Sequence, residues 1–393
     1  MRELTEQQKQ AIEKLHKTRV GALFMACGTG KTQTASALVN SVDNVHLLYW
    51  VCPCRTKENL ERELEQCGCK YKPRIVGVES IGCSDRIYTE ERQLLEEASK
   101  QGFVFMVVDE SIKIKNLKAR RTRRLLDLSK YARFKLILNG TPITKNICDI
   151  YAQMEFLSPK ILKSTYIQFR DRYCKYTQVK KHGRIKKTII TGYTNVDHLL
   201  SVIKPYVYQC ELELKVEKRY HTLRWYMSYG EREAYEQLKA QLFSEYIDYD
   251  GEHNMLAIMA KLQHSYCLCE DKFNELEKCI NDKSIIFCKY LDARDEVKRR
   301  YPNAMVLTYG TGSLGLNLQE YNRIIYFDKT FDYSFREQSE GRIYRNGQKL
   351  NCEYFDLTGD VGLEGIIDRC INNKESLVNY FKKYSNEQIK EMV

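Results

Sequence analysis

Residues Phe24 to Thr32 read FMACGTGKT, a pattern typical of a loop that binds nucleotide phosphates. An apolar run precedes the loop and a helix is predicted over residues 33–39, so a polyphosphate would meet unpartnered backbone N–H groups and the positive end of the helix dipole. Gly28 and Gly30 let the backbone approach the phosphates, and Lys31 would reach the β- and γ-oxygens as a point charge. The predicted nucleotide-binding residues of the loop are Cys27, Gly28, Thr29, Gly30, Lys31 and Thr32.

One position departs from the full phosphate-loop pattern. Met25 stands where the first glycine of that pattern is expected. The alternative is an ordinary strand–turn–helix that carries a stray GKT. The Thr32 hydroxyl would ligate Mg²⁺ in the nucleotide reading.

Two adjacent carboxylates follow a second apolar run. Residues Phe103 to Val108, FVFMVV, predict a buried parallel strand that ends at Asp109 and Glu110. Asp109 would hold Mg²⁺, and Glu110 would orient and deprotonate the attacking water. A strand that ends in solvated acids is the plainer interpretation, which an upstream GKT disfavours.

A basic run begins directly after the acids. From Lys113 to Lys135 there are ten Lys or Arg against the single acid Asp127. A solvated helix face is the usual interpretation of a charge run, but this one has a single sign and adjoins the predicted ATP site, which favours contact with nucleic-acid phosphates. The predicted nucleic-acid contacts here are Lys113, Lys115, Asn116, Arg120 and Arg121, with Arg55 and Lys57 after the strand at 46–51 as further candidates against plain solvated charges.

Composition limits the setting in which this chemistry takes place. With 393 residues, 43% hydrophobic and 29% charged, the chain is long enough for two domains, and its net charge of +11 points weakly to a polyanionic partner. No apolar run approaches the ~18 residues of a membrane span, and the start MRELTEQQKQ lacks the order of a signal peptide. We therefore expect a cytoplasmic protein without a membrane partner.

Cysteine usage agrees with a reducing compartment. The fifteen cysteines are scattered, and one lies inside the phosphate loop. Cys52 and Cys54 with Cys67 and Cys69 form the alternative of a zinc site, which their spacing does not favour.

The N-terminal segment predicts a helix within residues 1–20 that Thr5 would cap. Gln8 on this helix could read an adenine edge through its paired donor and acceptor, although an exposed helical glutamine is the plainer interpretation.

The order of motifs then resembles a known family. GTGKT at 28–32 is followed by DES at 109–111, IKN at 114–116, LNGTP at 138–142, Asp149, Tyr151 and FLSP at 156–159. This order resembles the first motor lobe of Swi/Snf-like ATPases, the double-stranded-DNA translocases within superfamily-two helicases. That family usually has DE-x-H, whose end is replaced here by Ser111 and Ile112, and an acidic residue at the Met25 position.

Motifs similar to those of the second lobe follow in order. They are SIIFC at 284–288, GSLGLNL at 312–318, residues 324–328, and the pattern Gln338-x-x-Gly341-Arg342-x-x-Arg345-x-Gly347-Gln348. The two arginines are predicted one helical turn apart on one helix face. The resemblance implies that Arg345 is an arginine finger for a γ-phosphate, that Arg342 supports it, and that Gln338 contacts the nucleotide.

The predicted fold class is α/β, with two RecA-like lobes made of parallel sheets flanked by helices and an ATP cleft between them. The expected domains are lobe 1 at 1–160, a mostly helical insertion or crossover at 161–283 with a basic hairpin at KKHGRIKK, and lobe 2 at 284–393 with C-terminal helices. Between Phe287 and Gly312 there is room for only one helix (291–300) and one strand (304–307), so lobe 2 is shortened, as in compact phage or mobile-element members.

The resemblance implies a DNA-dependent ATPase that moves on double-stranded DNA. Thr141 and the loop from Gly312 to Asn317 would pass lobe closure on to the DNA backbone. A strand-separating DNA or RNA helicase is the alternative, and a DNA-binding scaffold with a decayed motor is disfavoured while Lys31, Glu110 and Arg345 remain. Duplex DNA is the favoured partner, and proteins of a replication, recombination or restriction system are further candidates.

Overall fold

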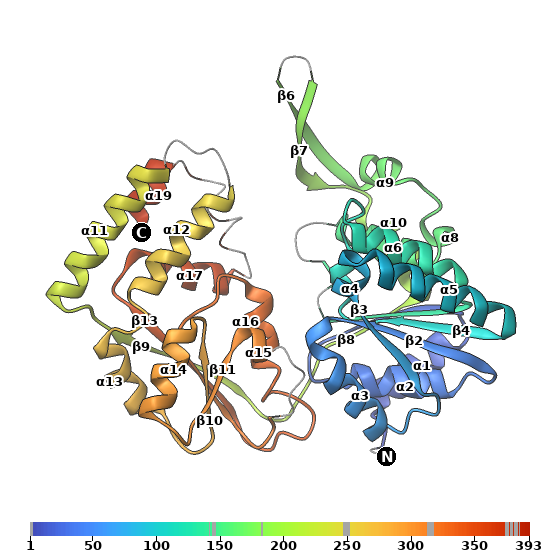
Figure 1. The fold of residues 1–393 in the computed structure, drawn as a ribbon, viewed down its shortest axis with the longest axis horizontal. Helices are drawn as coiled ribbons and strands as arrows, with labels where there is room; N and C mark the ends of the chain where they lie inside the picture. Colours follow the sequence, from blue (N-terminus) through green and yellow to red (C-terminus); the bar gives the residue numbers. More distant parts are fainter. Residues whose placement is uncertain are drawn as a thin grey trace. The chain divides into compact units, whose positions relative to one another are not determined.

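The chain forms two compact units, Met1–Leu212 and Glu213–Val393, in the computed structural model (Figure 1). The division lies inside the segment 161–283 that the sequence assigned to an insertion, so the boundaries differ from the expected ones at 160 and 283. The structure describes residues 3–140, 142–143, 147–181, 184–246, 252–312, 318–373, 377, 380, 384 and 386–393.

A parallel six-stranded sheet in the order β3-β2-β4-β5-β1-β8 forms the centre of the first unit. The predicted strand at 103–108 is confirmed, because its continuous apolar run is buried between two helical layers. The strands are β1 (Val20–Met25), β2 (Val45–Cys52), β3 (Pro73–Gly77), β4 (Phe103–Val108), β5 (Phe134–Asn139) and β8 (Val207–Cys210).

Helices cover both faces of this sheet. Along β1, Leu23 and Met25 pack in the cluster with α1, α2 and α3, whereas Ala22 and Phe24 pack with α4 to α7, as period-two alternation requires. The helices are α1 (Glu6–His16), α2 (Lys31–Asn40), α3 (Lys57–Gln66), α4 (Val78–Cys83), α5 (Asp85–Gln101), α6 (Arg120–Leu128) and α7 (Asp149–Leu157). Short 3₁₀ turns are η1 (Cys54–Thr56), η2 (Ser111–Ile114), η3 (Ser129–Tyr131) and η4 (Lys204–Tyr206).

A hairpin extends from the helical end of the first unit (Figure 1). Strands β6 (Cys174–Lys181) and β7 (Arg184–Tyr193) pair antiparallel and have no third partner in the described part of the chain. The hairpin predicted at KKHGRIKK is thus present, and its expected turn at His182 and Gly183 lies outside the described residues. Around its base stand α8 (Pro159–Leu162), α9 (Tyr166–Tyr173) and α10 (Val196–Ile203).

The second unit contains a parallel five-stranded sheet in the order β11-β10-β12-β13-β9. Its strands are β9 (Lys218–Trp225), β10 (Ser284–Cys288), β11 (Met305–Thr308), β12 (Arg323–Tyr326) and β13 (Cys352–Gly359). Its helices are α11 (Tyr229–Tyr246), α12 (Glu252–Ser265), α13 (Glu270–Cys279), α14 (Leu291–Arg300), α15 (Tyr309–Gly312), α16 (Tyr333–Glu340), α17 (Gly362–Asn372) and α19 (Asn386–Met392). The one helix and one strand expected between Phe287 and Gly312 are α14 and β11.

Strands β8 and β9 explain where the chain divides. β8 pairs with β1 in the first sheet and β9 pairs with β13 in the second, only a few residues later. The sequence analysis did not predict β9. Its residues, KRYHTLRW, lie at a sheet edge and expose charged side chains, so they lack the apolar run of a central strand. None of the described helices is both long enough and apolar enough to cross a bilayer.

Candidate ATP site and neighbouring basic surface

The carboxyl ends of four neighbouring strands lie together along one side of the first sheet, which we call the ligand edge. Parallel strands β1, β2, β4 and β5 all end there, so the phosphate loop, the segment after Cys52, the two acids and Gly140 follow neighbouring strands. Such an edge is where open α/β sheets bind ligands.

The phosphate loop depends on two glycines with positive φ. Gly28 has φ +84° and Gly30 has φ +82°, a conformation that costs other residues about 1–2 kcal/mol. Gly30 is the N-cap of α2 and provides no side-chain cap, which leaves the first N–H groups of this helix available to a ligand. A Cβ at Gly30 would lie 2.4 Å from the Nε2 atom of Gln8.

Gln8 supports the loop from α1. It is buried, its Oε1 accepts a hydrogen bond from the Thr5 N–H at 2.9 Å, and its Nε2 donates to the Thr29 carbonyl at 2.9 Å and to the Gly30 carbonyl at 3.4 Å. The predicted cap at Thr5 is confirmed as a capping box with Gln8. Gln8 is therefore not the exposed helical glutamine of the plainer interpretation. Adenine contact remains a prediction, and an adenine edge would compete with these bonds.

Lys31 is held at the loop by backbone carbonyls. Its Nζ donates to the carbonyls of Met25 at 3.1 Å and Ala26 at 3.3 Å, while the Thr29 hydroxyl donates to Ala26 at 2.8 Å. An ammonium beside an uncapped helix N-terminus fits a polyphosphate. Cys27 and Thr32 are half-buried at either side of these residues.

Asp109 and Glu110 follow β4 in a strained turn. The Asp109 N–H donates to the Val51 carbonyl at 2.8 Å, and Asp109 Oδ1 accepts from the Glu110 N–H at 2.9 Å. Glu110 has φ +49°, which is rare for a residue with a side chain and costs on the order of 1–3 kcal/mol. A strained backbone conformation of this kind persists only where contacts with the surrounding residues stabilise it.

Asp109 is buried beside Glu110 and Lys31, and both neighbours influence its protonation. Burial, followed by the charge of Glu110, raises the pKa of Asp109 to about 7, and the charge of Lys31 opposes this rise. A divalent cation would stabilise the ionised carboxylate. Thr32 and Asp109 are the side chains that would hold Mg²⁺, whose contribution is to neutralise charge on the phosphates.

The segment after the acids is attached to α7. The Ser111 hydroxyl donates to Gln153 Oε1 at 2.7 Å, and Lys115 Nζ lies 3.2 Å from Asp149 Oδ2. Sequence reasoning assigned no role to Gln153. The only signal was an amide in the otherwise mostly apolar α7 sequence DIYAQMEFL.

The basic run does not form one surface. Arg120 and Arg124 both pair with Asp85, and the buried Arg124 also donates to the carbonyls of Ile81 at 2.8 Å and Ser84 at 2.9 Å. Arg120, one of the predicted nucleic-acid contacts, and Arg124 therefore have an acidic partner within the unit, which offsets part of the positive charge of the run.

The other predicted nucleic-acid contacts differ in exposure and in the segment that carries them. Lys113 and Asn116 are exposed, and Arg121 Nε donates to the Lys113 carbonyl at 2.8 Å. After Cys52, Arg55 is exposed on η1 and Lys57 begins α3 at the ligand edge. Thr141 and Asn317 lie outside the described residues, and Gly312 is the last residue of α15.

The predicted arginines of the second unit are not on a helix. α16 ends at Glu340, Gly341 is its C-cap, and Arg342 and Arg345 lie in the turns that follow. The expectation of a shared helix face was therefore wrong: α16 ends with Gly341 as its C-cap, and Gly347, with φ +100°, belongs to the turns that follow. Both arginines are half-buried, and Gln338 is half-buried on α16.

Gln348 closes the turn that carries Arg345. Its Nε2 donates to the Tyr321 carbonyl at 2.8 Å and the Ile343 carbonyl at 3.2 Å, and its Oε1 accepts from the Lys349 N–H at 2.9 Å. The final Gly-Gln of the motif therefore fixes the loop conformation. Sequence reasoning assigned no role to Arg336, which is buried on α16 and pairs with Asp356 of β13.

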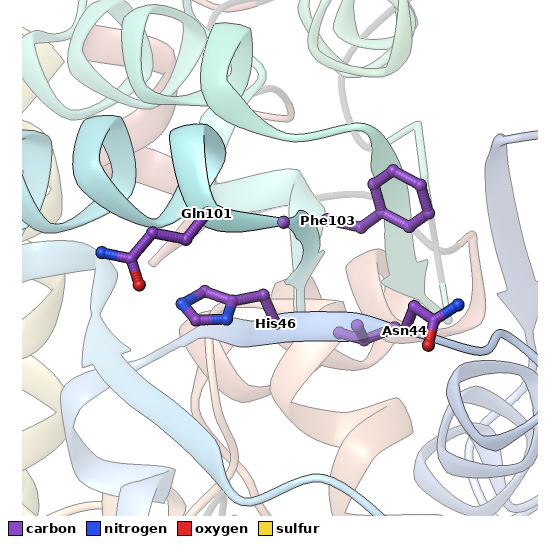
Figure 2. Close-up of a pocket in the computed structure, with 6 residues that line it drawn as sticks. Asn44, His46, Gln101 and Phe103 are labelled. Carbon is purple, nitrogen blue, oxygen red and sulfur yellow. The ribbon is translucent and has the colours of Figure 1, made fainter.

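A shallow pocket lies at the opposite edge of the first sheet. Figure 2 shows Asn44, His46, Gln101 and Phe103 around it, where β2 and β4 begin. No predicted site residue lines this pocket. It is thus distinct from the phosphate loop.

The cysteines are not gathered into a metal site in the described residues. No group of three or more His, Cys, Asp or Glu side chains there is placed to hold a metal ion. Burial raises the pKa of the Cys52 thiol to about 12.

Comparisons with known proteins agree with the motif order. The chain is 22% identical over 351 residues to an uncharacterized ATP-dependent helicase of Mycoplasma genitalium, covering 74% of this chain and 32% of the relative. It is 24% identical over 353 residues to the transcription regulatory protein SNF2 of Saccharomyces cerevisiae, covering 71% of this chain and 20% of the relative. The chain therefore spans only a fifth to a third of the length of these relatives.

A solved structure and a family match complete the comparison. The SWI2/SNF2 ATPase core of Sulfolobus solfataricus, solved in complex with double-stranded DNA, aligns over 100% of this chain and 95% of that chain, with 19% identity and a TM-score of 0.45. Residues 51–277, more than half of the chain, match the SNF2-related domain family. The chain, with its two parallel α/β units, belongs to the SNF2-related domain family.

Proposed function

We propose that this chain is a motor that hydrolyses ATP in order to move on double-stranded DNA. The observation that carries the proposal is the placement of the Lys31 loop and the Asp109–Glu110 pair at one edge of the first sheet, together with family membership. In this proposal the Lys31 loop binds phosphate, Asp109 holds Mg²⁺ and Glu110 activates water. These are the parts that ATP hydrolysis requires.

Each side chain has a separate task in this proposal. The N–H groups at the start of α2 and the Lys31 ammonium bind the phosphates, and Gln8 keeps the loop in the shape that exposes those groups. Glu110 accepts a proton from the attacking water. Arg345, held by the Gln348 turn, is proposed to stabilise the charge that develops on the γ-phosphate when the two lobes close.

Duplex DNA is the proposed track. Arg55, Lys57, Lys113 and Arg121 stand on segments that follow the ligand edge of the first sheet, and Thr141 follows the next strand. Phosphate contacts of this kind are independent of sequence, which suits movement along DNA. Partner proteins of a replication, recombination or restriction system remain proposals.

The decisive experiment compares ATP hydrolysis with duplex DNA, single-stranded DNA and RNA side by side. We expect duplex DNA to give the largest stimulation, and the Lys31→Ala protein to show none because its ATP binding is weakened. Displacement of a third strand from a triplex reports movement along the duplex, whereas release of a labelled strand from a forked duplex reports strand separation. Strand release without triplex displacement would favour the helicase alternative. Absence of hydrolysis with every nucleic acid would refute the proposal.

A further inference from the structure

One buried amide links three segments of the first unit. Gln153 on α7 is 0% exposed. Its Oε1 accepts from the Ser111 hydroxyl at 2.7 Å, and its Nε2 donates to the carbonyls of Pro142 at 2.8 Å and Asp149 at 2.9 Å. Both ends of the amide are therefore satisfied, as burial of a polar group requires.

Packing alone does not explain an amide at this position. The following residues Met154, Phe156 and Leu157 are fully buried in the hydrophobic core, and an apolar side chain of similar length would fill the same volume. The amide adds directional contacts to two segments that are distant in sequence. One segment begins directly after Glu110, the predicted water-activating residue, and the other follows Thr141, a predicted DNA contact.

The first of these segments begins directly after the water-activating residue. Glu110 has the strained φ of +49°, and Ser111, the next residue, is fully buried. The Glu110 carbonyl accepts from the Lys113 N–H at 2.9 Å, and the Lys115–Asp149 ion pair provides a second link to α7. The backbone of Glu110 is thus held from its C-terminal side by α7.

The second segment follows Thr141, the residue expected to sense the DNA backbone. Pro142 comes immediately after it, and the Pro142 carbonyl is the acceptor for Gln153. A displacement of this backbone would therefore pull on the same amide that holds Ser111. Because the core around α7 is closely packed, the amide cannot follow both segments independently.

We propose that Gln153 is a positioning residue that fixes the Glu110 backbone and couples it to the segment at Pro142. This inference rests on the proposed function, since it assigns to Glu110 the activation of water. Gln153 acts through Ser111 and touches neither nucleotide nor DNA. Its effect is therefore expected in kcat and not in the KM for ATP.

Three variants test the coupling. Ser111→Ala removes the donor to Gln153, Gln153→Met removes both ends of the amide at similar volume, and the third variant combines them. All three proteins lose the Ser111–Gln153 hydrogen bond, and that loss predicts a kcat lowered on the order of tenfold or more in each of them. If the two residues act through one contact, the double variant is no worse than Gln153→Met.

Ser129→Ala is the matched control. Ser129 is 5% exposed and its hydroxyl donates to the Leu126 carbonyl at 2.9 Å, so the variant also loses a buried serine hydrogen bond in the first unit. We expect its kcat with duplex DNA to equal that of the wild type. Unfolding midpoints of all four variants show whether a loss of rate follows from a loss of stability.

Amide hydrogen exchange provides a readout that does not depend on activity. Peptides that span residues 109–115 should exchange faster in Ser111→Ala and Gln153→Met than in the wild type and Ser129→Ala. Wild-type exchange in this segment, or a kcat within twofold of wild type for Ser111→Ala, would overturn the inference. Multiplicative losses in the double variant would overturn the coupling through one contact. A wild type without hydrolysis would instead refute the proposed function, and exchange would still test the positioning.

Discussion

Arg123 and Arg124 are neighbours in the basic run, yet the structure predicts opposite effects of replacing them. Arg124 is buried on α6 and its NH1 donates to the carbonyls of Ile81 and Ser84. Arg123 is exposed on the same helix. The change to methionine keeps most of the aliphatic stem and removes the guanidinium, so the pair Arg124→Met and Arg123→Met compares the contacts of a buried guanidinium with those of an exposed one.

The expected loss follows from the hydrogen bonds of Arg124. Arg124 donates to two carbonyl groups at 2.8 and 2.9 Å, and a hydrogen bond from a charged donor contributes about 1.5 kcal/mol or more to stability. The ion pair with the exposed Asp85 adds little, because solvent screens it. We expect Arg124→Met to lower the free energy of unfolding of the first unit by about 3 kcal/mol and Arg123→Met to change it by less than about 0.5 kcal/mol.

The two tryptophans make this measurable. The chain has 2 tryptophans, Trp50 on β2 and Trp225 on β9, one in each unit and both fully buried. In a Trp225→Phe background, fluorescence during urea unfolding therefore reports the first unit alone. A loss of about 3 kcal/mol would move the urea midpoint by about 1 M.

Equal midpoints for Arg123→Met and Arg124→Met would refute this reasoning. That result would mean that the carbonyls of Ile81 and Ser84 gain nothing from Arg124 beyond what water supplies. DNA titrations of both proteins at several salt concentrations would then measure the contribution of each arginine to DNA binding.

Three further predictions concern catalysis and DNA contact. Glu110→Gln should bind ATP normally while turnover falls by a factor on the order of 10² or more, measured by nucleotide titration and steady-state hydrolysis; near-normal turnover would remove Glu110 from the mechanism. Arg345→Ala should also retain ATP binding and lose roughly 10²-fold in DNA-stimulated hydrolysis, and equal rates in both proteins without DNA stimulation would mean that Arg345 is idle. Neutralising Lys113, Arg121 and Arg123 together should flatten the dependence of log affinity on log salt by up to about 0.9 per lost phosphate contact, whereas an unchanged slope would identify them as solvated charges.

Local signals were sufficient for the central strands and for the turn that leads into α2. The runs FVFMVV and SIIFC became β4 and β10 at the predicted residues, because a parallel strand covered on both faces requires apolar side chains at every position. Glycines before Lys31 indicated the turn that leads into α2, since their positive φ excludes most other residues. Both features depend only on residues that are adjacent in the sequence, so the local residue pattern is enough to predict them.

Other features depended on partners that are distant in sequence. β9 is an edge strand whose only described sheet partner is β13, more than a hundred residues later. Its exposed charged side chains interrupt the apolar pattern by which a strand is recognised in a sequence. The expected helix through Arg342 and Arg345 was replaced by turns that Gln348 fixes through the carbonyls of Tyr321 and Ile343.

The basic run shows most directly what the sequence determined and what the tertiary structure decided. The sequence determined that ten positive charges follow the two acids. It did not determine which of them meet Asp85, because that carboxylate belongs to α5 and reaches Arg120 and Arg124 only when α5 and α6 pack together. Charge is a property of each residue, whereas burial and pairing are properties of the packed chain. Only the tertiary structure therefore separates the arginines that hold the lobe together from those that remain available to DNA.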